Sequence, residues 1–459
     1  MTALPPTSPF PAAVAARLLD HGHAELRDAA LRIAGAGLAA CEPGAATELL
    51  VSLEGDALVV DGRALELAPD ARVVVLGAGK ATLPIAAALQ RLLGGRLAGG
   101  VVVVRAGEAE PLDPIEVLEA DHPLPSERSL TAGRRLLEVA GALRSQDVAL
   151  CCFTGGSSAL ASVPPRGVSF AEKRELHRLL LRSGAPIEQV NAVRKHVSLL
   201  KGGRIAAATP ARIVNLTVSD VAGNPLDAIT DPTVPDLSSV GEAIAALEHH
   251  GLWDAVPASV REHLLEGEAA SPALDAARIQ TVMLADGHTA CRAMAAEAQA
   301  LGLQPQIVST TLTGESREAG HLLAGLAAHS LAHGTPWQAG AALVGCGGET
   351  TVTLGAQAAL STGGPNQEAA LAAALALAGR PAAALFLDTD GIDGGTPLAG
   401  GLVDGTTAAR AAERGVNLPA ALRDHRATVA LEAVDDALLT GPTATNVNDL
   451  FVFVLGTEE

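Results

Sequence analysis

The stretch VVVLGAGKATLP, Val73–Pro84, decides how the first half of the chain is interpreted. Its first four residues are apolar and mostly β-branched, which is typical of a buried strand, and the residues from Ala81 onward favour a helix. A glycine turn between a strand and a helix points backbone N–H groups at whatever binds there. The role of Lys80, the cation at this turn, depends on the other motifs of the chain.

Two well-known glycine motifs do not match this turn. The phosphate loop of P-loop NTPases has a glycine where Val74 stands and Ser or Thr where Ala81 stands. The dinucleotide-binding fingerprint has a third small residue where Thr82 stands. The turn is therefore neither motif in its standard form.

The composition sets limits on the class of protein. A chain of 459 residues predicts roughly two to three domains, and 48% hydrophobic with 18% charged residues is ordinary for a well-buried soluble protein. The formal net charge of −19 argues against nucleic acid or an anionic membrane as a partner. Aromatic residues make up only 2% and tyrosine is absent, so platforms for base stacking are not expected.

The cysteines and the first residues of the chain indicate a cytoplasmic protein. The five cysteines show no spacing typical of metal sites, and an odd number in apolar segments favours reduced thiols. The first residues lack the charged-then-apolar pattern of a leader, and no apolar run approaches membrane-spanning length.

The alternation of β-rich and helix-period segments predicts a layered α/β fold with a mainly parallel sheet. Strands are expected at 72–76, 100–104, 113–119, 148–153, 212–218, 281–285, 305–310, 341–345, 350–354, 383–387 and 451–455. Helices are expected at 11–40, 81–93, 127–144, 171–183, 187–204, 287–301, 317–333, 367–379 and 427–436. A Pro-rich break near residue 235 precedes a second α/β unit that begins near Arg278. We assign residues 1–265 to an N-terminal domain and 266–459 to a C-terminal domain.

A second glycine turn follows the expected strand 148–153, in the segment CCFTGGSSAL. Gly155 and Gly156 allow a tight turn that cradles an anion, and Ser157 and Ser158 add hydroxyl donors. A plain N-capped turn is the alternative. The segment is not a nucleophile elbow, which requires Gly-X-Ser-X-Gly.

Basic residues gather in NAVRKHVSLLKGGR. At helical spacing Asn191, Arg194, Ser198 and Lys201 share one face, and Arg204 follows the two glycines that end the segment. Such a stripe is often only a solvated face, but in so acidic a chain it favours binding of a phosphate or a carboxylate.

A carboxylate follows the strand expected to end at residue 218, in TVSDVAGNPLDAIT. Asp220, close to Asn224 and its glycine–proline turn, could hold Mg²⁺ or take a proton from a hydroxyl. A helix cap or an Asx-turn is the alternative.

The C-terminal half carries VGCGGETTVTL, GGPNQEAAL and LFLDTDGIDGGTPLAGGLVDG. An EF-hand is excluded, because Asp393 stands at the glycine position and Ala399 at the glutamate position. We interpret the carboxylates as an acidic rim that contacts Mg²⁺ or ribose hydroxyls, with turn propensity as the alternative. These carboxylates are Asp388, Asp390, Asp393 and Asp404.

The histidines suggest no catalytic triad. We interpret His122, His196 and His288 as packed or capping residues, and no Ser–His–Asp order stands out.

Taken together, these motifs resemble the ATP-dependent glycerate 2-kinases, a family with an N-terminal Rossmann-like domain and a C-terminal MOFRL domain. Each motif is weak alone, but they occur in order over Leu76–Leu450. The motifs are LGAGKA, FTGGSSAL, NAVRKHVSLLKGGR, VSDVAGNPLDAI, GGETTVTL, GPNQEAAL, DTDGIDGGTPLAGGLVDG and TGPTATNVNDL.

The resemblance implies transfer of the γ-phosphoryl of ATP to the 2-hydroxyl of D-glycerate, with Mg²⁺, in a cleft between an N-terminal α/β/α domain and a C-terminal mixed α/β domain. Lys80 resembles the lysine beside the transferring phosphoryl group, Asp220 the carboxylate near the acceptor hydroxyl, and Arg194 a basic residue facing the cleft. The implied substrate- or phosphate-binding residues are Gly77, Gly79, Thr154, Gly155, Gly156, Ser157, Ser158, Asn191, Lys201 and Asn224. The implied nucleotide-binding residues are Gly348, Glu349, Asn366, Asp390 and Asp393, and the implied metal ligands are Asp220 and Asp388.

Two positions depart from the family pattern. The family usually reads Ser-Gly-Pro-Thr where this chain has Thr230-Asp231-Pro232-Thr233, which introduces an acid. It usually has an arginine where Pro365 stands, so one positive charge is missing. The close relatives of glycerate among small hydroxy acids remain open as substrates, and so does the oligomeric state, with a homodimer as one option.

Two other functions compete with the kinase. A nicotinamide-dependent hydroxypyruvate reductase would place the pyrophosphate over Gly77 and Gly79, but the third glycine and a ribose-binding acid about twenty residues on are missing. A non-catalytic sensor of sugar acids or nucleotides would bind ligand without releasing ADP.

Overall fold

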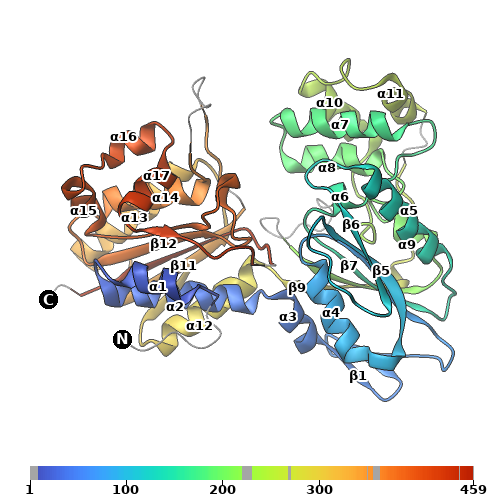
Figure 1. Cartoon of the computed structure of the whole chain (residues 1–459), viewed down its shortest axis with the longest axis horizontal. Helices are drawn as coiled ribbons and strands as arrows, with labels where there is room; N and C mark the ends of the chain where they lie inside the picture. Colours follow the sequence, from blue (N-terminus) through green and yellow to red (C-terminus); the bar gives the residue numbers. More distant parts are fainter. Residues whose placement is uncertain are drawn as a thin grey trace. The chain divides into compact units, whose positions relative to one another are not determined.

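The computed structural model divides the chain into two compact units (Figure 1). The glycine-loop unit comprises Pro43–Ser219 and the described residues up to Leu284, and the C-terminal unit comprises the described residues up to Glu42 and those from Ala285 onward. This division differs from the expected one at residue 265, since the first helices belong with the C-terminal half. The structure describes residues 9–219, 230–266, 270–348, 350–354, 362–443 and 445–457.

The glycine-loop unit is built on a six-stranded sheet of order β6-β5-β4-β7-β8-β9. Its strands are β4 (Val73–Ala78), β5 (Leu97–Arg105), β6 (Ile115–Ala120), β7 (Val148–Phe153), β8 (Arg212–Val218) and β9 (Ile279–Ala285). The neighbouring pairs from β6 to β8 are parallel. Numbered within the sheet, the order is 3-2-1-4-5-6, so the chain changes direction across the sheet between β4 and β7.

The strand expected to open the second unit, 281–285, belongs instead to this first sheet as β9. Arg278, just before β9, explains the placement. Its guanidinium donates to the carbonyls of Thr209 and Ala211, at 3.0 and 2.8 Å, and so ties β9 to the segment that leads into β8.

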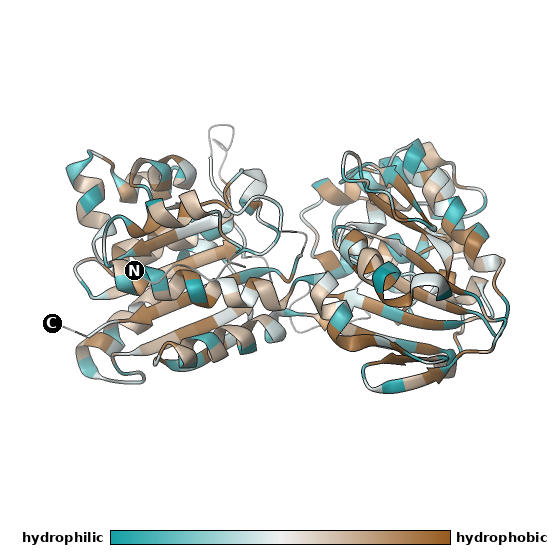
Figure 2. Cartoon of the chain, turned by 60° about the horizontal axis from the view of Figure 1, so that its bottom comes forward, coloured by the Kyte–Doolittle hydropathy of each residue, from teal (hydrophilic) through white to brown (hydrophobic). Residues whose placement is uncertain are grey.

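The core of this sheet follows from its apolar strands. Val73–Leu76 are all buried, as expected for a parallel strand covered on both faces. Helix α5 (Glu127–Gly141) starts with a capping box at Ser126 and buries Leu130 and Leu136 against the sheet. Figure 2 shows the central strands of each sheet as predominantly hydrophobic.

The rest of the glycine-loop unit adds a small sheet and further helices. Strands β1 (Val51–Glu54), β2 (Ala57–Val60) and β3 (Arg63–Glu66) form an antiparallel meander. Helices α7, α8, α10 and α11 share a separate apolar core. The helices are α3 (Pro43–Leu50), α4 (Thr82–Leu93), α6 (Ser157–Leu160), α7 (Phe170–Arg182), α8 (Ile187–His196), α9 (Arg204–Ala208), α10 (Val240–His249) and α11 (Ala258–Leu265).

The C-terminal unit has a mixed sheet of order β10-β11-β15-β12-β13-β14, in agreement with the mixed α/β fold expected there. Only the pair β10–β11 is parallel, and the other pairs are antiparallel. The expected strand 350–354 does not form; only Thr351 makes an isolated bridge, to Glu315. The strands are β10 (Gln304–Leu312), β11 (Ala341–Gly347), β12 (Ala382–Asp388), β13 (Gly400–Asp404), β14 (Ala437–Leu438) and β15 (Asp449–Leu455).

Helices cover this second sheet, and the expected helix 11–40 is divided in two at Gly22, whose φ is +66°. The second half, α2, packs on α12, β12 and β15, which explains why the start of the chain belongs to this unit. All five cysteines are buried free thiols, as expected. Within the described residues, no helix is long and apolar enough to cross a membrane. The helices are α1 (Ala12–Leu19), α2 (Ala24–Ala40), α12 (Gly287–Ala300), α13 (Ser316–His333), α14 (Pro365–Ala376), α15 (Thr407–Glu413), α16 (Leu418–Arg423) and α17 (Ala427–Ala433).

A buried arginine fastens α2 to the rest of the C-terminal unit. The Arg27 guanidinium lies 3.0 Å from Asp404 and 2.8 Å from Asp436, and its Nε donates to the Leu18 carbonyl. The side chains of Arg27 and both aspartates are fully buried. The interpretation of Asp404 as part of an acidic rim that contacts Mg²⁺ or ribose is therefore wrong, because its carboxylate is fully buried and is the counter-charge of Arg27.

Replacing Arg27 with methionine should lower the free energy of unfolding by about 3–5 kcal/mol, because two buried carboxylates lose a partner. The matched control is Arg32→Met on the same helix. Arg32 pairs with Glu297 in a partly exposed ion pair, so its loss should cost less than about 1 kcal/mol. Urea denaturation measures both changes, and equal losses would contradict the role given to Arg27.

Candidate functional site

The two glycine turns lie side by side at the point where the strand order reverses. Lys80 follows β4 and Gly155 follows β7, and these strands are parallel neighbours. The backbone N–H of Lys80 donates to the Gly155 carbonyl at 2.9 Å, and that of Ala81 donates to the Thr154 hydroxyl at 3.1 Å. The carboxyl ends of strands at such a reversal are where open α/β sheets bind ligands.

The glycines of the first turn are required by the closeness of the second. Gly79 has φ +139°, and a Cβ there would lie 2.7 Å from the Thr154 carbonyl oxygen. A Cβ at Gly77 would lie 2.6 Å from the Cys152 carbonyl oxygen. Both glycines therefore allow the two backbone segments to approach each other closely.

Gly79→Ala should destabilise the glycine-loop unit by about 3 kcal/mol or more, since left-handed strain and a clash with Thr154 add together. Gly107→Ala is the matched control, because Gly107 also has positive φ, +87°, but open space around it, and it should cost about 1 kcal/mol. Urea denaturation measures the loss in free energy of unfolding for each variant. Equal losses would contradict the conclusion that the close approach of the turns requires glycine at position 79.

Hydroxyl groups of the second turn interact with other segments of the protein. Thr154 is buried, and its hydroxyl also lies 3.5 Å from that of Thr82. Ser158 shares a 2.6 Å hydrogen bond with the Thr230 hydroxyl. Gly155, Gly156, Ser157 and Ser158 are half-buried, so this turn remains accessible from solvent.

Asp231, the acid that departs from the family pattern, is buried and stabilises the fold through hydrogen bonds. Its carboxylate accepts from the Asn215 amide at 3.0 Å and from the backbone and hydroxyl of Thr233 at 2.6 and 2.7 Å. Burial raises the pKa of Asp231 above its usual range. This carboxylate therefore joins the segment after residue 230 to β8.

The basic stripe forms only in part. Helix α8 ends at His196, and Val197 leaves the helical conformation with ψ +53°, so Ser198 and Lys201 are not on a continuing helix face. Instead, the Ser198 hydroxyl accepts from the N–H groups of Leu200 and Lys201. The expectation of one stripe from 191 to 201 is wrong, because a turn replaces the last part of the helix.

Arg194 and Asn191 lie on α8, where the Arg194 guanidinium lies 3.4 Å from the Asn191 side-chain oxygen. Arg194 is half-buried, and burial lowers its pKa to about 10. Its Nε has no hydrogen-bond partner among the described residues. A half-buried cation with unused donor capacity is suited to an anion.

Behind Arg194 the structure gathers buried basic groups. Lys173 and His177 lie on α7, and Lys201 lies beyond α8; all three are nearly inaccessible to solvent. The Lys201 ammonium donates to the Ala161 carbonyl at 3.3 Å, and that of Lys173 donates to the Val197 carbonyl. Among the described residues none of the three forms an ion pair with a carboxylate.

The pKa values of Lys173, His177 and Lys201 are all lowered. Burial, then the charges of Arg194 and Arg204, lower the pKa of Lys173 to about 7. Burial also lowers the pKa of Lys201 and His177 well below the usual range, with the neighbouring cations adding to the effect. Sequence reasoning missed Lys173 and His177, although their spacing with Leu176 and Leu180 places them on the apolar face of α7.

The lowered pKa of Lys173 makes stability depend on pH. In the unfolded chain a lysine has a pKa near ~10.4, so between pH 7 and 10 the unfolded state binds more protons and stability rises with pH. Lys173→Met should remove up to ~1.4 kcal/mol per pH unit of this rise. Urea denaturation at pH 7.5 and 9.5 measures it, with the exposed neighbour Arg174→Met as control. If the free energy of unfolding changes with pH equally in wild type and in Lys173→Met, the lowered pKa of Lys173 is contradicted.

Of the three histidines, only His196 is packed as expected. It is buried, with Nε2 3.4 Å from the Ser238 hydroxyl. His288 is exposed on α12. His122 follows β6, is also exposed, and makes no hydrogen bond to any residue that the structure describes. Its position beside the glycine turns is a feature that sequence reasoning missed.

Among the residues expected to bind nucleotide in the C-terminal unit, Asp393 is buried in the fold, whereas Gly348 and Asp390 are half-buried. The buried Asp393 carboxylate accepts from the backbone N–H groups of Asn366 and Gln367, at 3.1 and 3.0 Å, and so caps the start of α14. Burial raises the pKa of Asp393 to about 6. Gly348 and Asp390 are half-buried at the ends of β11 and β12.

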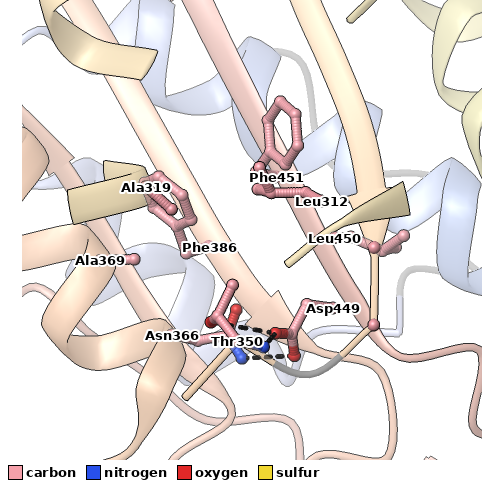
Figure 3. A pocket seen from close by; sticks show the side chains of 11 residues that line it. Leu312, Ala319, Thr350, Asn366, Ala369, Phe386, Asp449, Leu450 and Phe451 are labelled. Carbon is pink, nitrogen blue, oxygen red and sulfur yellow. Dashed lines mark hydrogen bonds between the residues drawn. The ribbon is translucent and has the colours of Figure 1, made fainter. Parts of the chain in front are cut away.

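A small cavity lies beside this helix start (Figure 3). Asn366 donates to Asp449 at 2.7 Å, and the same carboxylate accepts from the Thr350 N–H at 3.1 Å. The cavity volume is about 10 Å³, room for about one water, so a nucleotide does not fit inside this cavity.

Three expected site residues, Asp220, Asn224 and Glu349, lie outside the described residues. Asp388 is described and is buried at the end of β12, where its carboxylate accepts from the Asp390 N–H at 3.0 Å.

The fold defines a two-unit α/β protein whose paired glycine turns lie at a sheet reversal. Two family models match it: a domain of unknown function (DUF4147) over residues 29–265 and the MOFRL family over residues 342–449. Glycerate 2-kinase of Pyrococcus horikoshii is 36% identical over 94% of this chain and 98% of its own length. The chain therefore belongs to the glycerate 2-kinase family.

Further comparisons agree with this membership. The crystal structure of glycerate kinase from Thermotoga maritima matches with a TM-score of 0.81 and 34% identity, over 94% of this chain and 99% of that one. A relative from Agrobacterium vitis, 38% identical over 84% of this chain and 88% of its own length, is named a putative hydroxypyruvate reductase. The resemblance drawn from the ordered motifs is confirmed.

Proposed function

We propose that the protein is an ATP-dependent kinase that transfers the γ-phosphoryl group to the 2-hydroxyl of D-glycerate, giving 2-phosphoglycerate and ADP. The observation that carries the proposal is the hydrogen-bonded pair of glycine turns with Lys80 at the sheet reversal. The names of the relatives from Pyrococcus and Thermotoga support the substrate.

Phosphoryl transfer needs positioning and stabilisation of charge on the phosphoryl oxygens more than covalent catalysis. Lys80 is suited to this because its backbone is fixed to Gly155 while its half-buried side chain reaches the accessible edge of the sheet. Arg194, which is half-buried on α8, supplies a second cation in the same unit. We assign Lys80 to the transferring phosphoryl group and Arg194 to an anionic group of the substrate.

Asp220 is proposed as the carboxylate that receives the proton of the attacking hydroxyl, on the strength of its place in the motif after β8. Gly348 and Asp390 keep their proposed nucleotide-binding role. For Asp393 and Asn366 the capping network of α14 is the better-supported role.

We propose Mg²⁺ as an ion that arrives with the nucleotide. Among the described residues, no group of three or more His, Cys, Asp or Glu side chains is placed to hold a metal. Magnesium in kinases needs only one or two protein carboxylates, since phosphates and water supply the other ligands. Asp388 and Asp220 would provide them, and the ion would neutralise phosphate charge. A cytoplasmic location agrees with the five free thiols.

The competing function is a nicotinamide-dependent reductase, which the name of the Agrobacterium relative favours. The sequence supports it less well, because Thr82 stands where the dinucleotide fingerprint has its third glycine.

Lys80→Ala should reduce kcat/KM for D-glycerate to less than a tenth of the wild-type value, since it removes the cation beside the phosphoryl group. A coupled assay of ADP release measures this, and phosphorus NMR identifies the position of the product phosphate. Arg91→Ala is the matched control, because Arg91 is exposed on α4, the helix that follows the same turn, and should leave turnover unchanged.

Two outcomes would contradict the kinase. Steady oxidation of NADH with hydroxypyruvate and no ADP release with glycerate would support the reductase. Thermal stabilisation by glycerate or ATP with neither reaction would support a sensor.

A further inference from the structure

His122 lies against the second glycine turn. It is the second residue after β6, and a Cβ built on Gly156 would lie 3.3 Å from its Cδ2 and 3.4 Å from its Nε2. The same point is 3.8 Å from Cγ of Lys80, so the imidazole and the lysine side chain converge over Gly156. The residue is exposed and can meet a ligand at this edge of the sheet.

The surroundings of His122 favour the neutral form of its ring. Desolvation by the neighbouring protein lowers the pKa of His122 below its usual value, and the charges of Lys80, Arg105 and Arg194 lower it further. Glu108 acts in the opposite direction, but its carboxylate is paired with Arg105 at 2.8 Å. The structure thus favours an uncharged ring among cations at this edge of the sheet.

A neutral imidazole has one donor nitrogen and one acceptor nitrogen. His122 uses neither with any residue in the part of the chain that the structure describes. Carboxylate and phosphate oxygens only accept hydrogen bonds, and cations such as Lys80 and Arg194 suit them. A hydroxyl both donates and accepts, so it is the group that a neutral imidazole matches best.

We propose that His122 is a specificity-determining residue that hydrogen-bonds the hydroxyl of the hydroxy acid which does not receive the phosphoryl group. The inference rests on the proposed function, because glycerate carries two hydroxyls and only one of them is phosphorylated. His122 thereby distinguishes a dihydroxy acid from a monohydroxy acid of the same charge.

The test compares D-glycerate with D-lactate, which lacks the second hydroxyl. Isothermal titration calorimetry on the full chain gives Kd for both acids, and the ADP assay gives kcat/KM for glycerate. His122→Ala should weaken glycerate binding about tenfold, the loss of roughly one hydrogen bond, while lactate binding changes less than about threefold. His122→Asn, which keeps a donor and an acceptor, should recover most of the loss.

The controls separate recognition from folding. The exposed His288→Ala should change neither affinity, and the thermal midpoint of His122→Ala should equal that of wild type, since its side chain is exposed. Equal weakening for both acids would overturn the proposal in favour of a general positioning role. Unchanged glycerate affinity would also overturn it.

Failure of the proposed function is visible separately. If the wild type releases no ADP with glycerate, the kinase is wrong, yet the binding comparison still decides whether His122 recognises the second hydroxyl. If the wild type binds neither acid, both proposals fail together.

Discussion

The site depends on one constraint, the close approach of two backbone turns at the ends of β4 and β7. The chain reverses its direction across the sheet between these strands, so no helix connection separates their carboxyl ends. Hydrogen bonds from Lys80 and Ala81 to the second turn fix the distance, and glycines at 77 and 79 make it sterically possible. The position of the lysine follows from backbone geometry.

Much of this could be predicted from the sequence, because parallel strands covered on both faces are continuous apolar runs. The strands 148–153 and 212–218 occur as expected, and the two glycine turns follow their strands. The sequence does not predict the unit to which β9 belongs, since a short apolar strand does not reveal which sheet it joins. The same holds for the first helices, because the ion pair of Arg27 with Asp404 joins positions 377 residues apart.

The candidate site was predictable where its residues stand in one short motif, and not where tertiary structure assembles it. Lys80 and the TGGSS turn each lie in one short motif and were predictable. The end of α8 at His196 was not predictable, since Leu199 and Leu200 continue an apolar pattern while Ser198 forms a turn. His122 and Lys173 approach Arg194 only through folding, and neither has a motif of its own.

The distribution of charge explains how an acidic chain can bind an anionic substrate. The chain carries a net charge of −19, yet the carboxylates Asp231, Asp393 and Asp404 are turned inward to cap a helix, join strands or pair with Arg27. The cations Lys80, at the first glycine turn, and Arg194, on α8, are half-buried. With these three carboxylates committed to the fold, the site proposed for a small hydroxylated anion combines the two cations with the imidazole of His122.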